Sequence, residues 1–160
     1  LADPNHYKLD LASSLASIST HLMVREDLIG SMDALVTSRG GQFDVVIDAT
    51  GRSAVIEELP RLSRNGGRIV YYGVADENDR ITISPFEIFR RELTIMGSFT
   101  EVTSFPDALA AFRSGAIRTN GLITHRFSVD EYEQALHAMR TDKSAHKIVI
   151  TPREGKSNAR

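Results

Sequence analysis

The chain has 160 residues, the length of one ordinary domain, and is large enough to bury a hydrophobic core. Its apolar fraction of 41% and charged fraction of 25% are those of a globular protein, which excludes disordered and fibrous classes. A net charge of -2 gives no basic footprint for nucleic acid, and no apolar run approaches the roughly 18 residues of a membrane span. The absence of cysteine excludes disulfides and thiolate metal ligands, and fits a reducing cytoplasm.

Short β-type runs alternate with amphipathic helices over the first hundred residues. In chain order, the pattern predicts a helix over 9–15, a weak strand over 21–24, a helix over 28–36, a strand over 43–49, a helix over 55–62, a strand over 68–74 and a short strand over 93–96. The two middle strands are almost continuously apolar, which is typical of parallel strands covered on both faces. Pro60 predicts a kink in the third helix. The alternation indicates right-handed βαβ units on a parallel sheet.

The pattern of apolar and polar residues changes after about Phe99. A helix is expected around 105–112, with Pro106 in its first turn, followed by a strand over 122–127. Ser128 and Glu131 form a capping-box pattern ahead of a helix over 132–139. A last strand covers 147–152, and the polar residues 153–160 are expected to be frayed.

An acidic residue stands near the N-terminus, where Leu1-Ala2-Asp3 resembles the end of a strand. In dinucleotide-binding folds a carboxylate at such a strand tip binds the adenosine ribose and repels a 2′-phosphate. An Asp before Pro4 is also an ordinary turn or helix-start residue. None of the 11 glycines forms the glycine-rich G-x-G-x-x-G turn that binds pyrophosphate in these folds.

Small residues follow the two middle strands, at Gly51 and Gly73. Ligands of open parallel sheets lie across the carboxyl ends of the strands, where glycine lets a flat ring or a ribose approach the backbone. Both could equally be plain turn glycines. Asp48 is a lone carboxylate without a visible acid–base partner, and is expected to bind backbone amides in its own loop.

Catalytic and metal-binding groups are not evident in the sequence. The five histidines are scattered, without the spacing of a helical metal site, and no serine lies in a G-x-S-x-G elbow. No catalytic residue and no metal ligand is therefore predicted within this chain.

Five segments together resemble a known family. They are the runs 43–51, 66–73, 84–99, 122–127 and 147–152, which occur in order and without large gaps. They resemble the coenzyme domain of medium-chain dehydrogenases, and most closely zinc-containing polyol dehydrogenases of the sorbitol dehydrogenase type. The resemblance implies an α/β fold: a Rossmann-like, doubly wound parallel sheet that lacks its first strand and glycine-rich turn, with a C-terminal α/β tail. The implied domains are a partial coenzyme domain over 1–99 and a segment over 100–152 that packs on an absent catalytic domain.

The resemblance also implies a cofactor site for NAD. Asp3 would bind the adenosine ribose, with Lys8 as a second polar contact, and Lys147 would approach the pyrophosphate. The residues expected to line the crevice and the nicotinamide half are Thr50, Gly51, Gly73, Val74, Ser98 and Phe99. The edge strand Leu93–Met96 would join two subunits into a homodimer.

The implied activity is oxidation of a secondary alcohol or polyol by NAD, with zinc supplied by the missing half of a cytoplasmic enzyme. This chain would form the C-terminal portion and be inactive alone. Three alternatives remain: a zinc-independent quinone or enoyl reductase of the same superfamily, a non-catalytic nucleotide-binding module, and a methyltransferase, whose sheet also carries an acidic residue at a strand tip.

Overall fold

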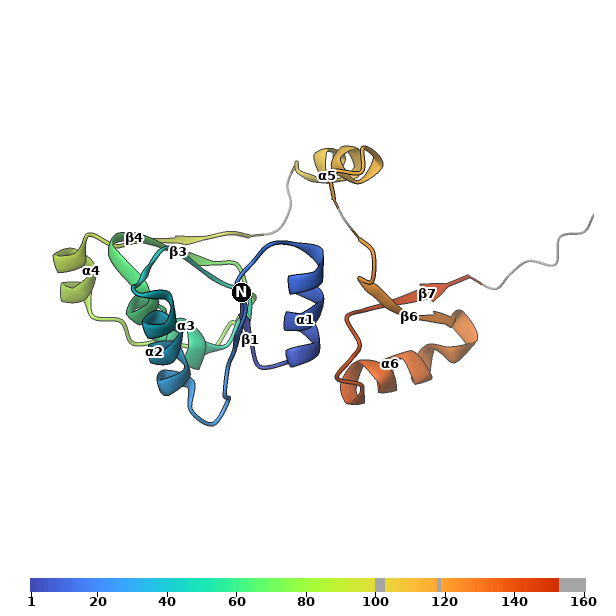
Figure 1. Cartoon of the computed structure of the whole chain (residues 1–160), viewed down its shortest axis with the longest axis horizontal. Helices are drawn as coiled ribbons and strands as arrows, with labels where there is room; N and C mark the ends of the chain where they lie inside the picture. Colours follow the sequence, from blue (N-terminus) through green and yellow to red (C-terminus); the bar gives the residue numbers. More distant parts are fainter. Residues whose placement is uncertain (100–102, 118, 153–160) are drawn as a thin grey trace, which may run out of the picture. The chain divides into compact units, whose positions relative to one another are not determined.

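The computed structural model describes residues 1–99, 103–117 and 119–152, which divide into two compact units (Figure 1). The first unit comprises Leu1–Leu22 together with the described residues from Pro106 onward, and the second comprises Met23–Phe105. Every strand pair in both units is parallel, as the alternation of elements predicts. The tail 153–160, expected to be frayed, lies outside the described residues.

The second unit is built on a three-stranded sheet of order β3-β4-β5. Its strands are β3 (Phe43–Asp48), β4 (Ser63–Tyr71) and β5 (Thr94–Gly97), and its helices are α2 (Leu28–Arg39), α3 (Ser53–Leu62) and α4 (Pro85–Arg91). The predicted middle strands and helices are all present, with β4 beginning five residues earlier than expected. Helix α4, which begins with a Ser84 cap and Pro85 in its first turn, was not predicted from the sequence.

Helices α2 and α3 cover one face of this sheet (Figure 1). The core contains Met32 of α2, Leu59 and Leu62 of α3, Val46 of β3, Ile69 of β4 and Leu93. The neighbouring side chains of Val45 and Ile47 point to the other face and are 48% and 61% exposed. Within this unit β3 is therefore covered on one face, where its apolar sequence predicted cover on both.

Three turns fix the ends of these helices. Helix α2 ends at Gly40 in the left-handed conformation, with φ +78°, as a glycine after a helix predicts. Helix α3 continues to Leu62 with Pro60 inside it, although proline has no N–H to donate to the carbonyl of Ile56 one turn earlier. Helix α4 ends at Glu92, which is left-handed with φ +52° although it carries a side chain.

The first unit contains two separate parallel pairs, β1-β2 and β6-β7. Its elements are β1 (Ala2–Asp3), α1 (His6–Leu15), β2 (His21–Leu22), α5 (Phe105–Arg113, whose first residue belongs to the second unit), β6 (Ile123–Ser128), α6 (Tyr132–Thr141) and β7 (Lys147–Thr151). The predicted capping box is confirmed, since the Glu131 carboxylate accepts hydrogen bonds from both the N–H and the hydroxyl of Ser128 at 2.8 Å. None of the described helices is long and apolar enough to cross a membrane.

Candidate functional site at the carboxyl ends of the strands

The carboxyl ends of β3, β4 and β5 lie in register at one edge of their sheet. Asp48 pairs with Tyr71, and Tyr71 pairs with Gly97. The residues that follow these three positions include six of those predicted to contact a cofactor: Thr50, Gly51, Gly73, Val74, Ser98 and Phe99. The topology therefore gathers these six residues along one edge of a parallel sheet, the place where ligands of open sheets bind.

Asp48 organises the turn that leaves β3. Its side chain is buried, with 1% exposed, and accepts hydrogen bonds from the backbone N–H and hydroxyl of Thr50 at 2.9 and 2.7 Å. The N–H of Gly51 donates to its second oxygen at 3.1 Å. The prediction that Asp48 binds backbone amides in its own loop is confirmed. A buried carboxylate with this many donors is satisfied without a counter-ion.

The turn after β3 packs directly on the end of β4. A Cβ on Gly51, where φ is +64°, would lie 2.1 Å from the carbonyl oxygen of Val74. A Cβ on Gly73 would lie 2.3 Å from the backbone nitrogen of Gly51. Both glycines are therefore required by close backbone packing, and in addition Gly51 has a conformation that favours glycine.

The side chains beyond β4 and β5 are largely open to solvent. Val74 is 88% exposed and Phe99 is 86% exposed. The N–H of Ser98 donates to the carbonyl of Tyr71 at 2.9 Å, so this N–H is used by the sheet and does not contact a ligand. Tyr71 has a buried hydroxyl with no hydrogen-bond partner among the described residues; burial first, and then the Asp48 charge, raises the pKa of Tyr71 above 10.

Two further predicted residues, Asp3 and Lys8, lie at the start of α1 in the first unit. Asp3 ends β1, and its Oδ1 accepts a hydrogen bond from the N–H of Asn5 at 2.8 Å. Asn5 caps α1, since its Oδ1 accepts from the N–H of Tyr7 at 3.0 Å. Lys8 is exposed in the first turn of the helix. This turn fixes one oxygen of the Asp3 carboxylate.

Lys147, the last predicted residue, begins β7 in the same unit. Its N–H donates to the carbonyl of Leu122 at 3.2 Å, and its side chain is exposed. The loop before it, residues 142–146, is attached to β6: Nε2 of His125 lies 3.2 Å from Asp142, and the N–H of His146 donates to the Thr124 hydroxyl at 3.0 Å. The sequence analysis missed this loop, because its partners lie on another strand.

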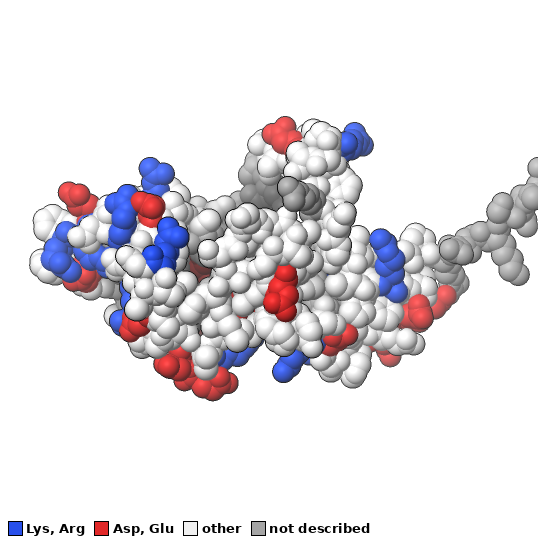
Figure 2. All heavy atoms as spheres, viewed as in Figure 1, with Lys and Arg blue, Asp and Glu red and all other residues white. Residues whose placement is uncertain are grey.

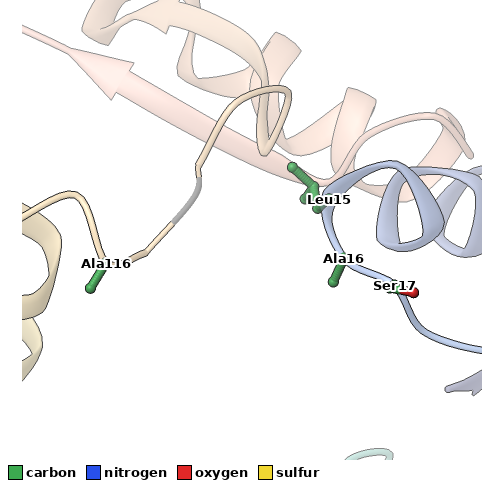
Figure 3. A pocket seen from close by; sticks show the side chains of 4 residues that line it. All are labelled: Leu15, Ala16, Ser17 and Ala116. Atoms are coloured by element: carbon green, nitrogen blue, oxygen red, sulfur yellow. The ribbon is translucent and has the colours of Figure 1, made fainter.

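A hollow of about 520 Å³ lies elsewhere in the first unit (Figure 3). Its lining residues are Leu15, Ala16, Ser17 and Ala116, none of which carries an ionisable side chain. None of the predicted cofactor residues lines it. Its chemistry supports neither acid–base catalysis nor metal binding.

The described residues also contain no group of three or more His, Asp or Glu side chains that could hold a metal ion. A zinc ion implied by family resemblance therefore does not fit this part of the chain. Figure 2 shows basic and acidic side chains interspersed over the face in view, with no extended basic patch on that face.

The profile of the zinc-binding dehydrogenases matches residues 1–114. The chain belongs to the zinc-binding dehydrogenase family. Curated relatives of this zinc-binding dehydrogenase chain include D-arabinitol dehydrogenase 1 of Uromyces fabae, which is 35% identical over 95% of the chain, and D-altritol 5-dehydrogenase of Agrobacterium fabrum, which is 33% identical over 92%. The chain spans 44% and 41% of these relatives, less than half of each.

Solved structures show the same fold. A short chain alcohol dehydrogenase from Escherichia coli in complex with NADH gives a TM-score of 0.82 at 22% identity, with 94% of this chain and 43% of that one covered. A Sinorhizobium meliloti protein assigned as a zinc-binding dehydrogenase, with NADP bound, gives 0.79 at 26% identity, covering 95% and 44%. The predicted α/β fold of parallel strands is thereby confirmed.

Proposed function

We propose that this chain is the coenzyme-binding portion of a dehydrogenase that oxidises a secondary alcohol or polyol with NAD. The observation that supports it most directly is the alignment of Asp48, Tyr71 and Gly97 at one sheet edge, with a tightly packed glycine turn beside them. The names of the curated relatives, which are polyol dehydrogenases, support the substrate class.

The residues at this edge fit the nicotinamide half of a dinucleotide. Val74 and Phe99 are large apolar side chains that stand almost fully exposed, and a flat ring could cover them. A bound nicotinamide ring would accept the hydride from the alcohol. Gly51 and Gly73 let the turns after β3 and β4 pack closely at this edge. The carbonyl of Ser98 and the N–H of Phe99 have no backbone partner among the described residues and would orient a carboxamide.

Asp3 supports a preference for NAD over NADP. Its Oδ1 is held by the N–H of Asn5, and Oδ2, which has no hydrogen-bond partner among the described residues, would accept hydrogen bonds from ribose hydroxyls. A 2′-phosphate at the same place would meet a carboxylate of like charge. One related structure contains NADH and another contains NADP, so the proposed preference of this chain for NAD rests on Asp3.

A binding titration tests this function. The purified chain is titrated with NADH and with NADPH, and nucleotide fluorescence is followed. We expect weak binding with NADH favoured, and Asp3→Ser, which keeps an acceptor for Asn5, should bring the two affinities together. Asp10→Ser, on the exposed surface of α1, is the matched control. No binding of either nucleotide, or an unchanged ratio in Asp3→Ser, would contradict the proposal.

Catalysis requires groups that the described residues do not supply. We expect no alcohol-dependent production of NADH by the chain alone, in the cytoplasm or in purified form, and steady turnover in an absorbance assay would overturn this part of the proposal.

The homodimer also belongs to this proposal. Strand β5 pairs with β4 alone among the described strands, so its other edge has unpaired backbone groups. Light scattering across a range of concentrations should show a dimer, and a monomer throughout would contradict it.

A further inference from the structure

Asn5 connects parts of the first unit that lie far apart in the sequence. Besides capping α1, its side-chain amide donates a hydrogen bond to the carbonyl oxygen of Lys143 at 2.7 Å, across 138 positions. Its own N–H holds the Asp3 carboxylate at 2.8 Å. One residue therefore contacts the acidic strand tip, the first turn of α1 and the loop before β7.

The loop that receives this bond is itself firmly held. Oδ1 of Asp142 accepts hydrogen bonds from the N–H and hydroxyl of Ser144 at 2.8 and 2.6 Å, while its Oδ2 lies 3.2 Å from Nε2 of His125. The N–H of His146 is bonded to Thr124 on β6. A loop fixed in this way presents the Lys143 carbonyl at a defined place. Pairing with this ordered acceptor costs less conformational entropy than pairing with a mobile acceptor would.

The bond joins two predicted contacts of one cofactor. Asp3 lies two residues before Asn5, and Lys147 lies four residues after Lys143 at the start of β7. We propose that Asn5 is a positioning residue whose bond to Lys143 sets the spacing between the ribose-binding carboxylate and the strand that carries the phosphate-binding lysine. This inference rests on the proposed function and on the expectation from the sequence that Asp3 and Lys147 contact the same nucleotide.

Asn5→Asp tests the inference without removing the helix cap. Aspartate caps a helix as well as asparagine does, so the acceptor for Tyr7 is kept. It has no donor for the Lys143 carbonyl, so the bond is lost. Because aspartate also adds a charge that repels a diphosphate, Asn5→Ser, which keeps a capping oxygen without a charge, must show the same loss. Lys143→Ala is the matched control, because it removes the ammonium group and leaves the backbone carbonyl that Asn5 contacts.

Two ligands separate positioning from general damage. Adenosine contains the ribose alone, whereas adenosine 5′-diphosphate reaches both predicted contacts. In Asn5→Asp we expect unchanged affinity for adenosine and a loss of about fivefold for the diphosphate, the effect of one hydrogen bond. Affinities are measured by nuclear magnetic resonance titration, and hydrogen exchange should be faster in residues 142–146 while α1 stays protected. Lys143→Ala should retain that protection.

Each remaining outcome contradicts a specific statement. An equal loss for both ligands would assign Asn5 a purely structural role, and no loss for either would remove its role in binding. If Lys143→Ala weakened the diphosphate as much as Asn5→Asp, the ammonium group and not the Asn5 bond would be responsible. If the unaltered chain bound neither ligand, the proposed function would fail, and the inference that rests on it would fail with it.

Discussion

A methyl group on Gly73 would lie 2.3 Å from the backbone nitrogen of Gly51 and 2.6 Å from the Asp48 carboxylate. Neither neighbour can move away without breaking the turn after β3. Gly73→Ala should therefore lower the free energy of unfolding by about 1–3 kcal/mol, measured by urea denaturation. Gly97→Ala is the matched control, since a Cβ at Gly97 meets nothing within 4 Å. Similar losses in both variants would contradict the packing argument.

Asp48→Asn should destabilise the second unit. An amide in place of the carboxylate turns an NH₂ group toward Thr50 or Gly51, whose N–H groups are donors, and leaves at least one of them unpaired. We expect a loss of about 1–3 kcal/mol in urea denaturation. Asp44→Asn, at the exposed end of the same strand, should have a much smaller effect because its partner Arg64 is a surface residue. Equal effects would show that the burial of Asp48 is irrelevant.

Arg91→Lys should also be destabilising. The Arg91 guanidinium donates to the carbonyl of Pro60 at 3.0 Å, to Asn65 at 3.1 Å and to the carbonyl of Ser63, and so joins α4 to the α3–β4 connection. A lysine ammonium cannot reproduce this planar set of donors. We expect a loss of about 1–3 kcal/mol by thermal or urea unfolding. Arg90→Lys, at an exposed pair with Glu87, should have little effect, and the reverse order would be evidence against this role of Arg91.

The capping box formed by Ser128 and Glu131 makes the free energy of unfolding depend on pH. Hydrogen bonds from the N–H and then the hydroxyl of Ser128 lower the pKa of Glu131 below its ordinary 4.5. Its contribution is complete above pH 4.5 and is lost as the pH falls through the lower value of the folded state. Glu131→Gln does not titrate, so its stability relative to the unaltered chain should improve between pH 5 and pH 3. Urea denaturation across this range tests this. The control Glu133→Gln removes a nearby charge without contacting Ser128, and an identical change in it would argue against the capping box.

Much of the fold could be predicted from local patterns. The β-type runs give β3 and β4, the helical spacing gives α2 and α3, and the capping box marks the start of α6, because each signal lies within a few residues of the element. Helix α4 was missed because it has seven residues and exposes Phe86 and Phe89, so its apolar pattern does not follow a buried face.

The candidate site was predictable to a lesser extent. Resemblance supplied the positions, and the register of β3, β4 and β5 brings six of them to one edge. The roles of Asn5 and of the His125–Asp142 pair could not be predicted, since their partners are distant in the sequence and no local pattern encodes them. The sequence also left open whether Gly51 and Gly73 are plain turn glycines. The backbone structure was needed to decide this, because only the close approach of the two strand ends explains why both positions require glycine.

The left-handed Glu92 has a consequence for how this sequence can change in length. Only Glu92 and Leu93 separate α4 from β5, and Leu93 is already buried in the core. Inserting or deleting one residue in this turn would reverse the alternation along β5, bringing Met96 toward the helices and turning Ile95 outward. Relatives of this chain should therefore conserve the length of the α4–β5 connection, while the longer segment between β4 and α4 tolerates insertions.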